Sequence, residues 1–595
     1  MNFFKTFLAS ILGTILGVLL LFLILFASIM SSSSEAEPYI RSNTVLKMNI
    51  SGDIPVRPLD DPFEELFNPS AGAKFSLEGL RSNLKKAAAD DNIGAVWVQT
   101  NMVGASWANL QRAYSYFEEY KESGKPLYFS TDDLGMNEKS YFLATLADSI
   151  FSPPETNFQF QGFVAQFTFY REMLDKIGIE PEIFRVGKYK SAVEPYMNES
   201  SSPESREQTR EILFAASETF VNAVAKRTGK SSEEINALLN TPPVDRVNFA
   251  LENGLIDAIA FEDEVESFIK QRLEIDEDSD LRTVSFGRYS RVSPKSAGVD
   301  VPDTKNRIAV LHASGIILPD LGDSPFGGSS GITIKNFKSQ LDRALDNDDV
   351  KAIVIHIDSP GGAATTSDLL WHNIRKASEK MPVVASMGSV AASGGYYMAM
   401  AADTVLAAEN TITGSIGIFS LLFNASELLN DKIGLNYETI TTHQYADLYD
   451  LSRPFTSSEK AVIQQGIENG YESFLKRVAE SRGMTRDQVH EVAQGRVYTG
   501  LAAKETGLID LVGDLDRAIE IAAEMAEIDE YLLDIYPKKR DLFETLFSSS
   551  SAQVRNMLTS WMPKDLRNDV NDLHAILNQP AGMNWALLPI RITVD

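Results

Sequence analysis

The feature that most constrains the fold of this chain is an internal repeat. Three short motifs recur in the same order after 253 to 256 residues: DKIG at 175–178 and 431–434, GLID at 254–257 and 507–510, and LAD at 146–148 against AAD at 401–403. Single matches of this length arise by chance, but three collinear matches at a nearly constant offset indicate a duplicated domain. The length of 595 residues agrees, because one hydrophobic core usually stops growing near ~250–300 residues.

Each repeat has the pattern of an α/β domain. Short apolar runs alternate with helical patterns: strands are expected at 352–357, 382–386 and 404–406, helices at 366–380 and 398–402, and a matching first-half strand at 95–100. Such alternation implies parallel strands with helical crossovers. A polar, proline-containing segment separates the halves. The expected parts are a first repeat at 45–275, a linker at 276–303, a second repeat at 304–535 and a helical extension at 536–595.

The N-terminus carries an apolar segment of membrane-spanning length. Residues 7–30 contain no charged side chain, and as a helix they would span ~36 Å, more than a hydrocarbon core of ~30 Å. Lys5 precedes the segment and Glu37 follows it, so the positive-inside rule places the tip at 1–6 in the cytoplasm and the body outside. A cleaved signal peptide is the alternative, but its apolar region should span only about 7–15 residues. We expect a retained single-pass anchor.

Composition excludes several functional classes. Asp and Glu total 82 against 55 Lys and Arg, and the net charge of −27 would repel a phosphate backbone, so no nucleic-acid partner is expected. The chain has no cysteine, which rules out disulfides, thiol catalysis and cysteine-ligated zinc. No His-Glu-x-x-His or similar spacing is present, so no metal site is expected.

The segment 387–397, MGSVAASGGYY, is the strongest candidate for a catalytic turn. Ser393 lies between small residues and precedes two glycines, which suits a nucleophile at a tight strand-to-helix turn. Small neighbours allow a substrate to approach, and N–H groups at a helix start can face a developing oxyanion. The alternative is a close-packed glycine and alanine helix start with an incidental serine.

Two other glycine-rich segments are candidate parts of the same site. In the sequence DSPGG, Gly361 and Gly362 follow a buried strand, and their N–H groups could form an oxyanion hole with that of Gly394. A plain turn is the alternative. In the sequence TGSIG, Ser415 could hydrogen-bond a catalytic partner or could be only a turn serine.

A serine nucleophile needs a base, and the histidines do not offer an obvious one. The chain has six: His312, His356, His372, His443, His490 and His574. None lies in an obvious glycine-flanked loop, so the pattern does not support a Ser-His-Asp triad. A Ser-His protease on the same fold remains an alternative.

Four motifs together resemble signal peptide peptidase A, in the long, duplicated protease IV form of Gram-negative bacteria. They occur in the expected order: VGKYKSAVEP at 186–195, DSPGG at 358–362, SVAASGGYY at 389–397 and TGSIG at 413–417. The resemblance extends from about residue 45 to about residue 535. It implies two tandem crotonase/Clp-protease-like α/β domains behind a single transmembrane helix. It also implies a homotetramer in the inner membrane, with the catalytic body in the periplasm.

The resemblance further implies a Ser–Lys dyad. Ser393 would be the nucleophile, Lys190 the general base, and Ser415 a residue that orients the amine. Lys188 and Lys190 point the same way on a strand, so only the motif match separates them. An exposed lysine titrates near ~10.4, so the base must be buried to be neutral. The implied substrates are cleaved signal peptides and other apolar peptides, with no cofactor.

The repeat agrees with one site built from both halves. The offset places Glu138 at the position of Ser393 and Ala446 at the position of Lys190, while the glycine pair has the single counterpart Gly104. Each half lacks what the other keeps, as expected if the active site spans the two domains. Two further hypotheses are a crotonase-type acyl-CoA enzyme, which shares the superfold and its glycine-rich loops, and a non-enzymatic membrane scaffold.

Overall fold

The first repeat contains a six-stranded sheet in which all neighbouring strands are parallel. The computed structural model describes residues 13, 14, 17, 37–57, 75–242, 244–320, 331–538 and 585–587. The strands in spatial order are β6 (Ala258–Ile259), β4 (Ser149–Ser152), β3 (Leu127–Thr131), β2 (Ile93–Val103), β1 (Thr44–Gly52) and β7 (Thr283–Ser285). The central strand β2 is mostly buried, as expected where helices cover both faces of a parallel sheet.

The second repeat contains an eight-stranded sheet with the same central path. Its strands in that path are β16 (Leu511–Val512), β12 (Thr404–Ala407), β11 (Val383–Ala392), β9 (Val350–Ser359), β8 (Arg307–Ser314) and β17 (Leu532–Tyr536). Strands β13 (Ile412–Gly414) and β15 (Val497–Thr499) extend the sheet beyond the end of β11. The spatial order of the strands from β16 to β17 matches the order from β6 to β7 in the first repeat. The predicted duplication is therefore confirmed.

The boundary between the repeats differs from the expected linker. Strand β7 and helix α12 (Phe286–Tyr289) lie inside the segment 276–303, and β7 pairs with β1 at the edge of the first sheet. The strand has only three residues, which is too short to show a periodic pattern in the sequence. The first repeat therefore extends past residue 275, and β7 holds the place that β17 holds in the second repeat.

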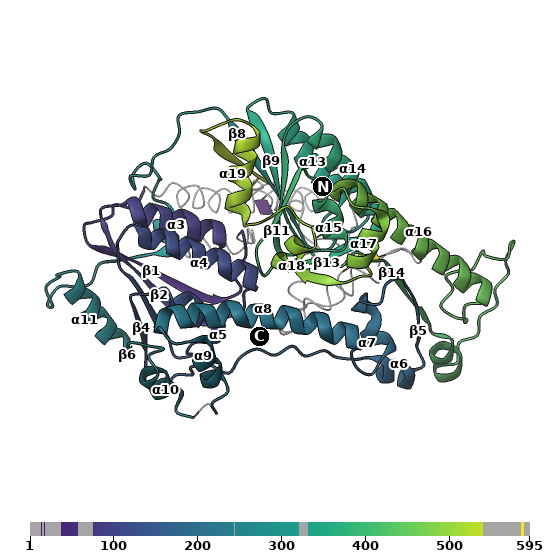
Figure 1. Cartoon of the computed structure of the whole chain (residues 1–595), viewed down its shortest axis with the longest axis horizontal. Helices are drawn as coiled ribbons and strands as arrows, with labels where there is room; N and C mark the ends of the chain where they lie inside the picture. The colour runs from purple at the N-terminus through teal and green to yellow at the C-terminus, as the bar shows by residue number, and fades with distance from the viewer. Residues whose placement is uncertain are drawn as a thin grey trace, which may run out of the picture.

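Helices cover the sheets of both repeats (Figure 1). In the first repeat they are α3 (Leu77–Ala89), α4 (Trp107–Glu122), α5 (Glu138–Ala144), α6 (Arg171–Ile177), α7 (Glu194–Met197), α8 (Pro203–Thr228), α9 (Ser232–Leu239), α10 (Arg246–Glu252) and α11 (Glu262–Arg272), with a 3₁₀ turn at Ser191–Val193. In the second repeat they are α13 (Ile334–Leu345), α14 (Ala364–Ser378), α15 (Gly394–Ala399), the π-helix η3 (Glu427–Ile433), α16 (Ser457–Arg482), α17 (Arg486–Val492), α18 (Gly500–Glu505) and α19 (Leu515–Met525).

The two longest of these helices, α8 and α16, are counterparts of equal length, 26 residues each. Ser202 caps the start of α8, and Thr456 caps α16 in a reciprocal box with Glu459. Both helices end at a glycine in the left-handed region, Gly229 and Gly483. The same start and stop signals thus define the same element in each repeat.

A third, antiparallel sheet joins the repeats. Its order is β10 (Gly361–Ala363), β18 (Trp585–Leu587), β14 (Phe419–Asn424) and β5 (Glu180–Arg185). Strand β5 belongs to the first repeat and pairs along its whole length with β14 of the second. This pairing brings the segment after β5, which contains Lys190, against the second repeat.

The elements predicted in the second repeat are found close to their expected places. The strands lie in β9, β11 and β12, and the helix at 366–380 is α14. The helix expected at 398–402 is α15, which begins four residues earlier at Gly394 because the turn at Ser393 starts it directly.

Some predictions fall outside the described residues. The apolar segment 7–30 lies outside them except for residues 13, 14 and 17, and most of the extension 536–595 does as well. Within the described part of the chain, no helix is long and apolar enough to cross a membrane. The extension was expected to be helical, but residues 585–587 form strand β18, because they pair with the backbone of β10.

Candidate active site

Ser393 lies at the turn between β11 and α15, in a conformation that few serines adopt. Its φ is 54° and its ψ is −111°, in the left-handed half of the backbone map, and its N–H donates to the carbonyl of Gly414 at 2.8 Å. The turn packs closely against β9, because a Cβ at Gly395 would lie 2.5 Å from the carbonyl oxygen of Ser359. Strained backbone of this kind persists only where the surroundings hold it, and it clusters at functional sites.

The side chain of Lys190 reaches Ser393 from the other repeat. Lys190 follows β5, and its Nζ lies 2.9 Å from Ser393 Oγ. The same nitrogen lies 3.0 Å from Ser415 Oγ and 3.1 Å from the carbonyl oxygen of Ser415. The three residues expected from separate motifs are therefore brought together, and the contact joins the two repeats of one chain.

Burial decides the protonation state of this amine. Lys190 and Ser393 are both 0% exposed. Desolvation holds the pKa of Lys190 well below the ordinary lysine value of 10.5, and no carboxylate among the described residues opposes this effect. A neutral amine within hydrogen-bonding distance of a hydroxyl can accept its proton, so the pair can generate a nucleophilic alkoxide.

Two glycines of the second repeat make room for the stem of Lys190. A Cβ at Gly495 would lie 2.6 Å from Lys190 Cβ, and one at Gly417 would lie 3.2 Å from Lys190 Cδ. Gly417 belongs to the TGSIG motif, but Gly495 was not singled out in the sequence. In the sequence, Gly495 is only a glycine in a polar turn. The side chain that occupies the space beside it, that of Lys190, belongs to the other repeat.

Ser415 is also held in an unusual backbone conformation, with φ of 52°. Its N–H donates to the carbonyl of Arg496 at 2.6 Å, so the segment that contains Gly495 also fixes Ser415. The Arg185 guanidinium donates to the backbone carbonyl of Lys190 at 3.0 Å, which helps to hold the lysine backbone in place. Backbone contacts in both repeats, at Lys190 and at Ser415, therefore position the groups that surround the Lys190 amine.

The three candidate oxyanion glycines differ in their present contacts. Gly361 has φ of 101°, and its N–H donates to Ser359 Oγ at 3.2 Å. Gly362 packs so tightly that an added Cβ would lie 1.9 Å from the carbonyl oxygen of Ile317. Gly394 is the first residue of α15, where an N–H has no acceptor within its helix. The N–H of Gly361 therefore already has an acceptor, Gly362 lies in the ladder with β18, and the N–H of Gly394 has no acceptor within its helix.

The histidines do not provide a base for this serine. None of the five histidines that the structure describes hydrogen-bonds to Ser393, whose hydroxyl contacts Lys190. His356 lies within β9 with its Nδ1 3.3 Å from Ser386 Oγ, and its ring is 5.4 Å from that of His312 on β8. The described residues also contain no cluster of side chains suited to a metal ion.

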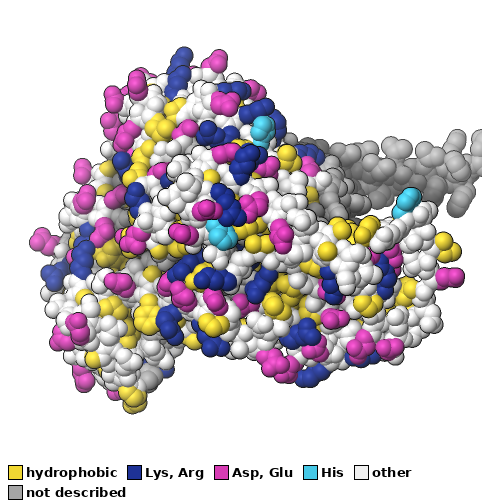
Figure 2. All heavy atoms as spheres, turned by 45° about the vertical axis from the view of Figure 1, so that its right-hand side comes forward, with side chains coloured by type: hydrophobic (Ala, Val, Ile, Leu, Met, Phe, Trp, Pro, Cys, Tyr) yellow, Lys and Arg dark blue, Asp and Glu magenta, His cyan; other side chains and the backbone are white. Residues whose placement is uncertain are grey.

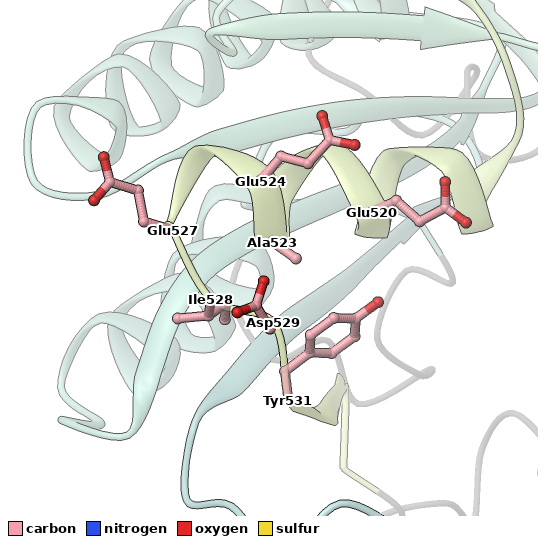
Figure 3. Close-up of a pocket in the computed structure, with 7 residues that line it drawn as sticks. All are labelled: Glu520, Ala523, Glu524, Glu527, Ile528, Asp529 and Tyr531. Carbon is pink, nitrogen blue, oxygen red and sulfur yellow. The ribbon is translucent and has the colours of Figure 1, made fainter.

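A surface hollow at the end of α19 lies apart from these residues (Figure 3). Its lining is mainly acidic: Glu520, Ala523, Glu524, Glu527, Ile528, Asp529 and Tyr531. None of Ser393, Lys190 and Ser415 lines it. The hollow therefore does not belong to the candidate active site.

Comparison with known proteins places both repeats in one family. A model of peptidase family S49 matches residues 119–276 and 375–529, one segment in each repeat. The chain is 35% identical to "Serine protease SPPA, chloroplastic" of Arabidopsis thaliana, over 82% of this chain and 70% of that protein. It is 30% identical to "Protease 4" of Salmonella typhi, over 91% of this chain and 88% of that protein. A solved ClpP1 mutant from Listeria monocytogenes covers 35% of this chain and 94% of its own, with 14% identity and a TM-score of 0.23.

Proposed function

The chain belongs to peptidase family S49 and is a serine peptidase, and from this premise we propose that Ser393 is its nucleophile and Lys190 its general base. The observation that carries the proposal is the 2.9 Å contact between Ser393 Oγ and a lysine amine that is fully buried. Lys190 accepts the hydroxyl proton while Oγ attacks the substrate carbonyl carbon. The N–H of Gly394, together with that of Gly361 or Gly362, holds the developing oxyanion.

The same two residues complete the reaction. The protonated Lys190 gives its proton to the leaving amine, the peptide bond breaks, and the acyl group remains on Ser393. Lys190 then removes a proton from water, and the water oxygen attacks the ester carbonyl carbon. The bond to Ser393 Oγ breaks, Lys190 returns the proton to Oγ, and the acid is released. Ser415 acts as a positioning residue, because its hydroxyl and carbonyl oxygens fix the amine in both steps.

For substrates, we propose cleaved signal peptides and other apolar peptides in extended conformation. Two observations support this class. The apolar segment 7–30 would hold the chain in the inner membrane, with the tip in the cytoplasm and the body in the periplasm, where such peptides are concentrated. The edge of β10, which carries Gly361 and Gly362, already accepts an extended segment in antiparallel pairing, namely β18.

A panel of fluorogenic peptides tests this function directly. Full-length protein in detergent should cleave apolar peptides faster than acidic ones of equal length. Ser393→Ala should lower turnover by ~10³-fold or more, since the loss of a nucleophile leaves only binding and oxyanion effects. Wild-type turnover in Ser393→Ala, or a preference for acidic peptides, would contradict the proposal.

Localisation has its own test. The full-length chain should stay in the membrane fraction after a carbonate wash, and protease added on the periplasmic side should digest the body. A mature protein that begins near Ser31 would show that the segment is a cleaved signal peptide. The implied homotetramer is the remaining part of the proposal, and light scattering of the full-length protein measures it.

A further inference from the structure

Gln208 lies on the buried face of α8 and forms hydrogen bonds with both polar atoms of its side-chain amide. The residue is 2% exposed. Its Nε2 donates to Ser191 Oγ at 2.9 Å and to the carbonyl oxygen of Tyr189 at 3.4 Å. These two acceptors belong to the residues on either side of Lys190. The nitrogen end of the amide therefore holds the segment that carries the candidate base.

The oxygen end of the same amide contacts the second repeat. The N–H of Val497, the first residue of β15, donates to Gln208 Oε1 at 3.2 Å. Val497 pairs with Gly414 of β13, and the carbonyl oxygen of Gly414 accepts the N–H of Ser393 at 2.8 Å. Figure 1 shows α8 as a long helix that runs from the first repeat to a position below β13 and α18. Gln208 is thus linked to the candidate nucleophile through a single strand pair.

The residues just before Val497 position two further parts of the site. The carbonyl oxygen of Arg496 accepts the N–H of Ser415, and Gly495 leaves space for the stem of Lys190. An amide that binds both Val497 and the flanks of Lys190 fixes these two segments relative to each other. An amide suits this place because it offers a donor and an acceptor without a charge. A carboxylate would instead stabilise the protonated form of the amine.

Arg496 makes further side-chain links between the same two segments, but they lie nearer to solvent. Its guanidinium lies 2.7 Å from Glu211 Oε1 and donates to the hydroxyl of Tyr189 at 3.2 Å, and the Glu211 side chain is 50% exposed. Figure 2 shows basic and acidic side chains interspersed over one face of the molecule, as on an ordinary solvated surface. Exposed ion pairs contribute little to stability. Glu211 therefore supplies a control position on the same helix as Gln208.

We propose that Gln208 is a positioning residue for the reaction, because its amide sets the place of the Lys190 amine relative to Ser393 Oγ. This inference rests on the proposed dyad and adds a residue that touches neither the substrate nor the reacting atoms. The same bridge holds the lysine segment against β15 and so keeps water from Lys190, which is 0% exposed. Loss of the amide should let the segment move away from β15, lengthen the Nζ to Oγ distance and admit water to the amine.

Gln208→Met tests this role, because methionine keeps the length of the side chain and removes both hydrogen-bonding atoms. In the full-length protein, kcat on an apolar peptide should fall ~10–10²-fold with little change in KM, since a small displacement of a catalytic group slows the chemical step. The midpoint of the pH–rate profile should move up toward the ordinary lysine value, because water reaches the amine. Glu211→Ala should keep the wild-type rate and midpoint.

Ser191→Ala provides a second variant that acts on the same hydrogen bond. It removes one acceptor of the amide but leaves Val497 its partner, so it should lower kcat less than Gln208→Met does. In the double variant the two losses should not add, because both remove one shared contact. Circular dichroism melting of each variant separates this role from a structural one, since lost stability alone changes neither kcat nor the midpoint of the folded enzyme.

The result that would overturn the inference is a folded Gln208→Met with the kcat and pH midpoint of wild type. If Gln208→Met does not fold, a wild-type kcat in Ser191→Ala would overturn it. Lys190→Ala, assayed beside these variants, separates this inference from the proposed function. An active Lys190→Ala would refute the dyad itself, whereas an inactive Lys190→Ala beside a fully active Gln208→Met would refute only the positioning role.

Discussion

At the scale of single residues, the chemistry depends on keeping an amine neutral in a buried place. Among the described residues, the polar contacts of the Lys190 amine are two serine hydroxyls and a backbone carbonyl, with no carboxylate beside it. These groups accept or share a hydrogen bond without stabilising a positive charge as a carboxylate would. The same burial that makes the lysine costly for the fold makes it a base near neutral pH.

Replacement of the two neighbouring lysines separates their roles. Lys190→Ala should lower turnover by ~10²–10⁴-fold, the usual contribution of a general base, while the variant folds and assembles normally. Lys188 is exposed and lies over the ring of Tyr189, so Lys188→Ala should keep most activity. Initial rates on one apolar peptide measure both effects. Equal rates in wild type and Lys190→Ala would refute the base assignment.

The pH–rate profile reports the protonation of Lys190. The neutral amine is the active form, and burial lowers its pKa well below 10.5, so kcat/KM should rise with pH through that lowered pKa and then level off. Circular dichroism at each pH controls for unfolding. A midpoint at the ordinary lysine value, or a rate that falls across the neutral range, would not fit a desolvated base.

At the scale of elements, the interface between the repeats holds a buried histidine pair. His312 on β8 lies 3.1 Å from Glu78 on α3, and His356 on β9 lies beside it, with the buried Arg112 of α4 nearby. Burial lowers the pKa of both histidines below 6.5, and for His356 the Arg112 charge lowers it further. Burial at this interface therefore favours neutral rings, and the Glu78 carboxylate partly offsets this effect at His312.

Acid should weaken the fold through this pair. The folded-state pKa is below the unfolded value, so the unfolded chain binds more protons as pH falls below ~6.5, and stability is lost in that range. The melting temperature should fall less between pH 7 and pH 5 in His356→Gln than in wild type. His443→Gln, at an exposed residue, should follow wild type. If the melting temperatures of His356→Gln and wild type fall equally between pH 7 and pH 5, the histidine pair does not cause the loss of stability in acid.

The sequence predicts the central strands well, because β9 and β11 contain apolar runs that can be recognised from their own residues. Strands β5 and β14 were not predicted, since their partners lie in the other repeat and neither shows a strong local period. The motifs identified Ser393, Lys190 and Ser415, and the structure brings all three together. Gly495 was missed for a physical reason: its role is the space that it leaves for a side chain distant in the sequence.

At the scale of the whole molecule, one chain builds one complete site. The internal β5–β14 contact brings Lys190 to Ser393, whereas the equivalent positions in the other direction hold Glu138 and Ala446. Glu138 is buried and accepts hydrogen bonds from the N–H groups of Gln161 and Gly162, so its carboxylate has a structural contact there. The duplication has thus kept two folds but only one Ser393–Lys190 pair.

Mixed assemblies test whether the site is confined to one chain. Lys190→Ala and Ser393→Ala chains, co-expressed and co-purified through different tags, should remain as inactive as each variant alone, because no chain then holds both residues. A dyad that formed between chains would instead recover a measurable part of wild-type turnover. The rate per mole of mixed assembly measures the difference.

The most direct measurement of the central claim is fluorophosphonate labelling followed by peptide mapping of full-length protein. The account predicts one label per chain at Ser393, formed at least ~10²-fold more slowly in Lys190→Ala and at the wild-type rate in Lys188→Ala. A label on another serine, or wild-type labelling of Ser393 in Lys190→Ala, would contradict the Ser393–Lys190 dyad.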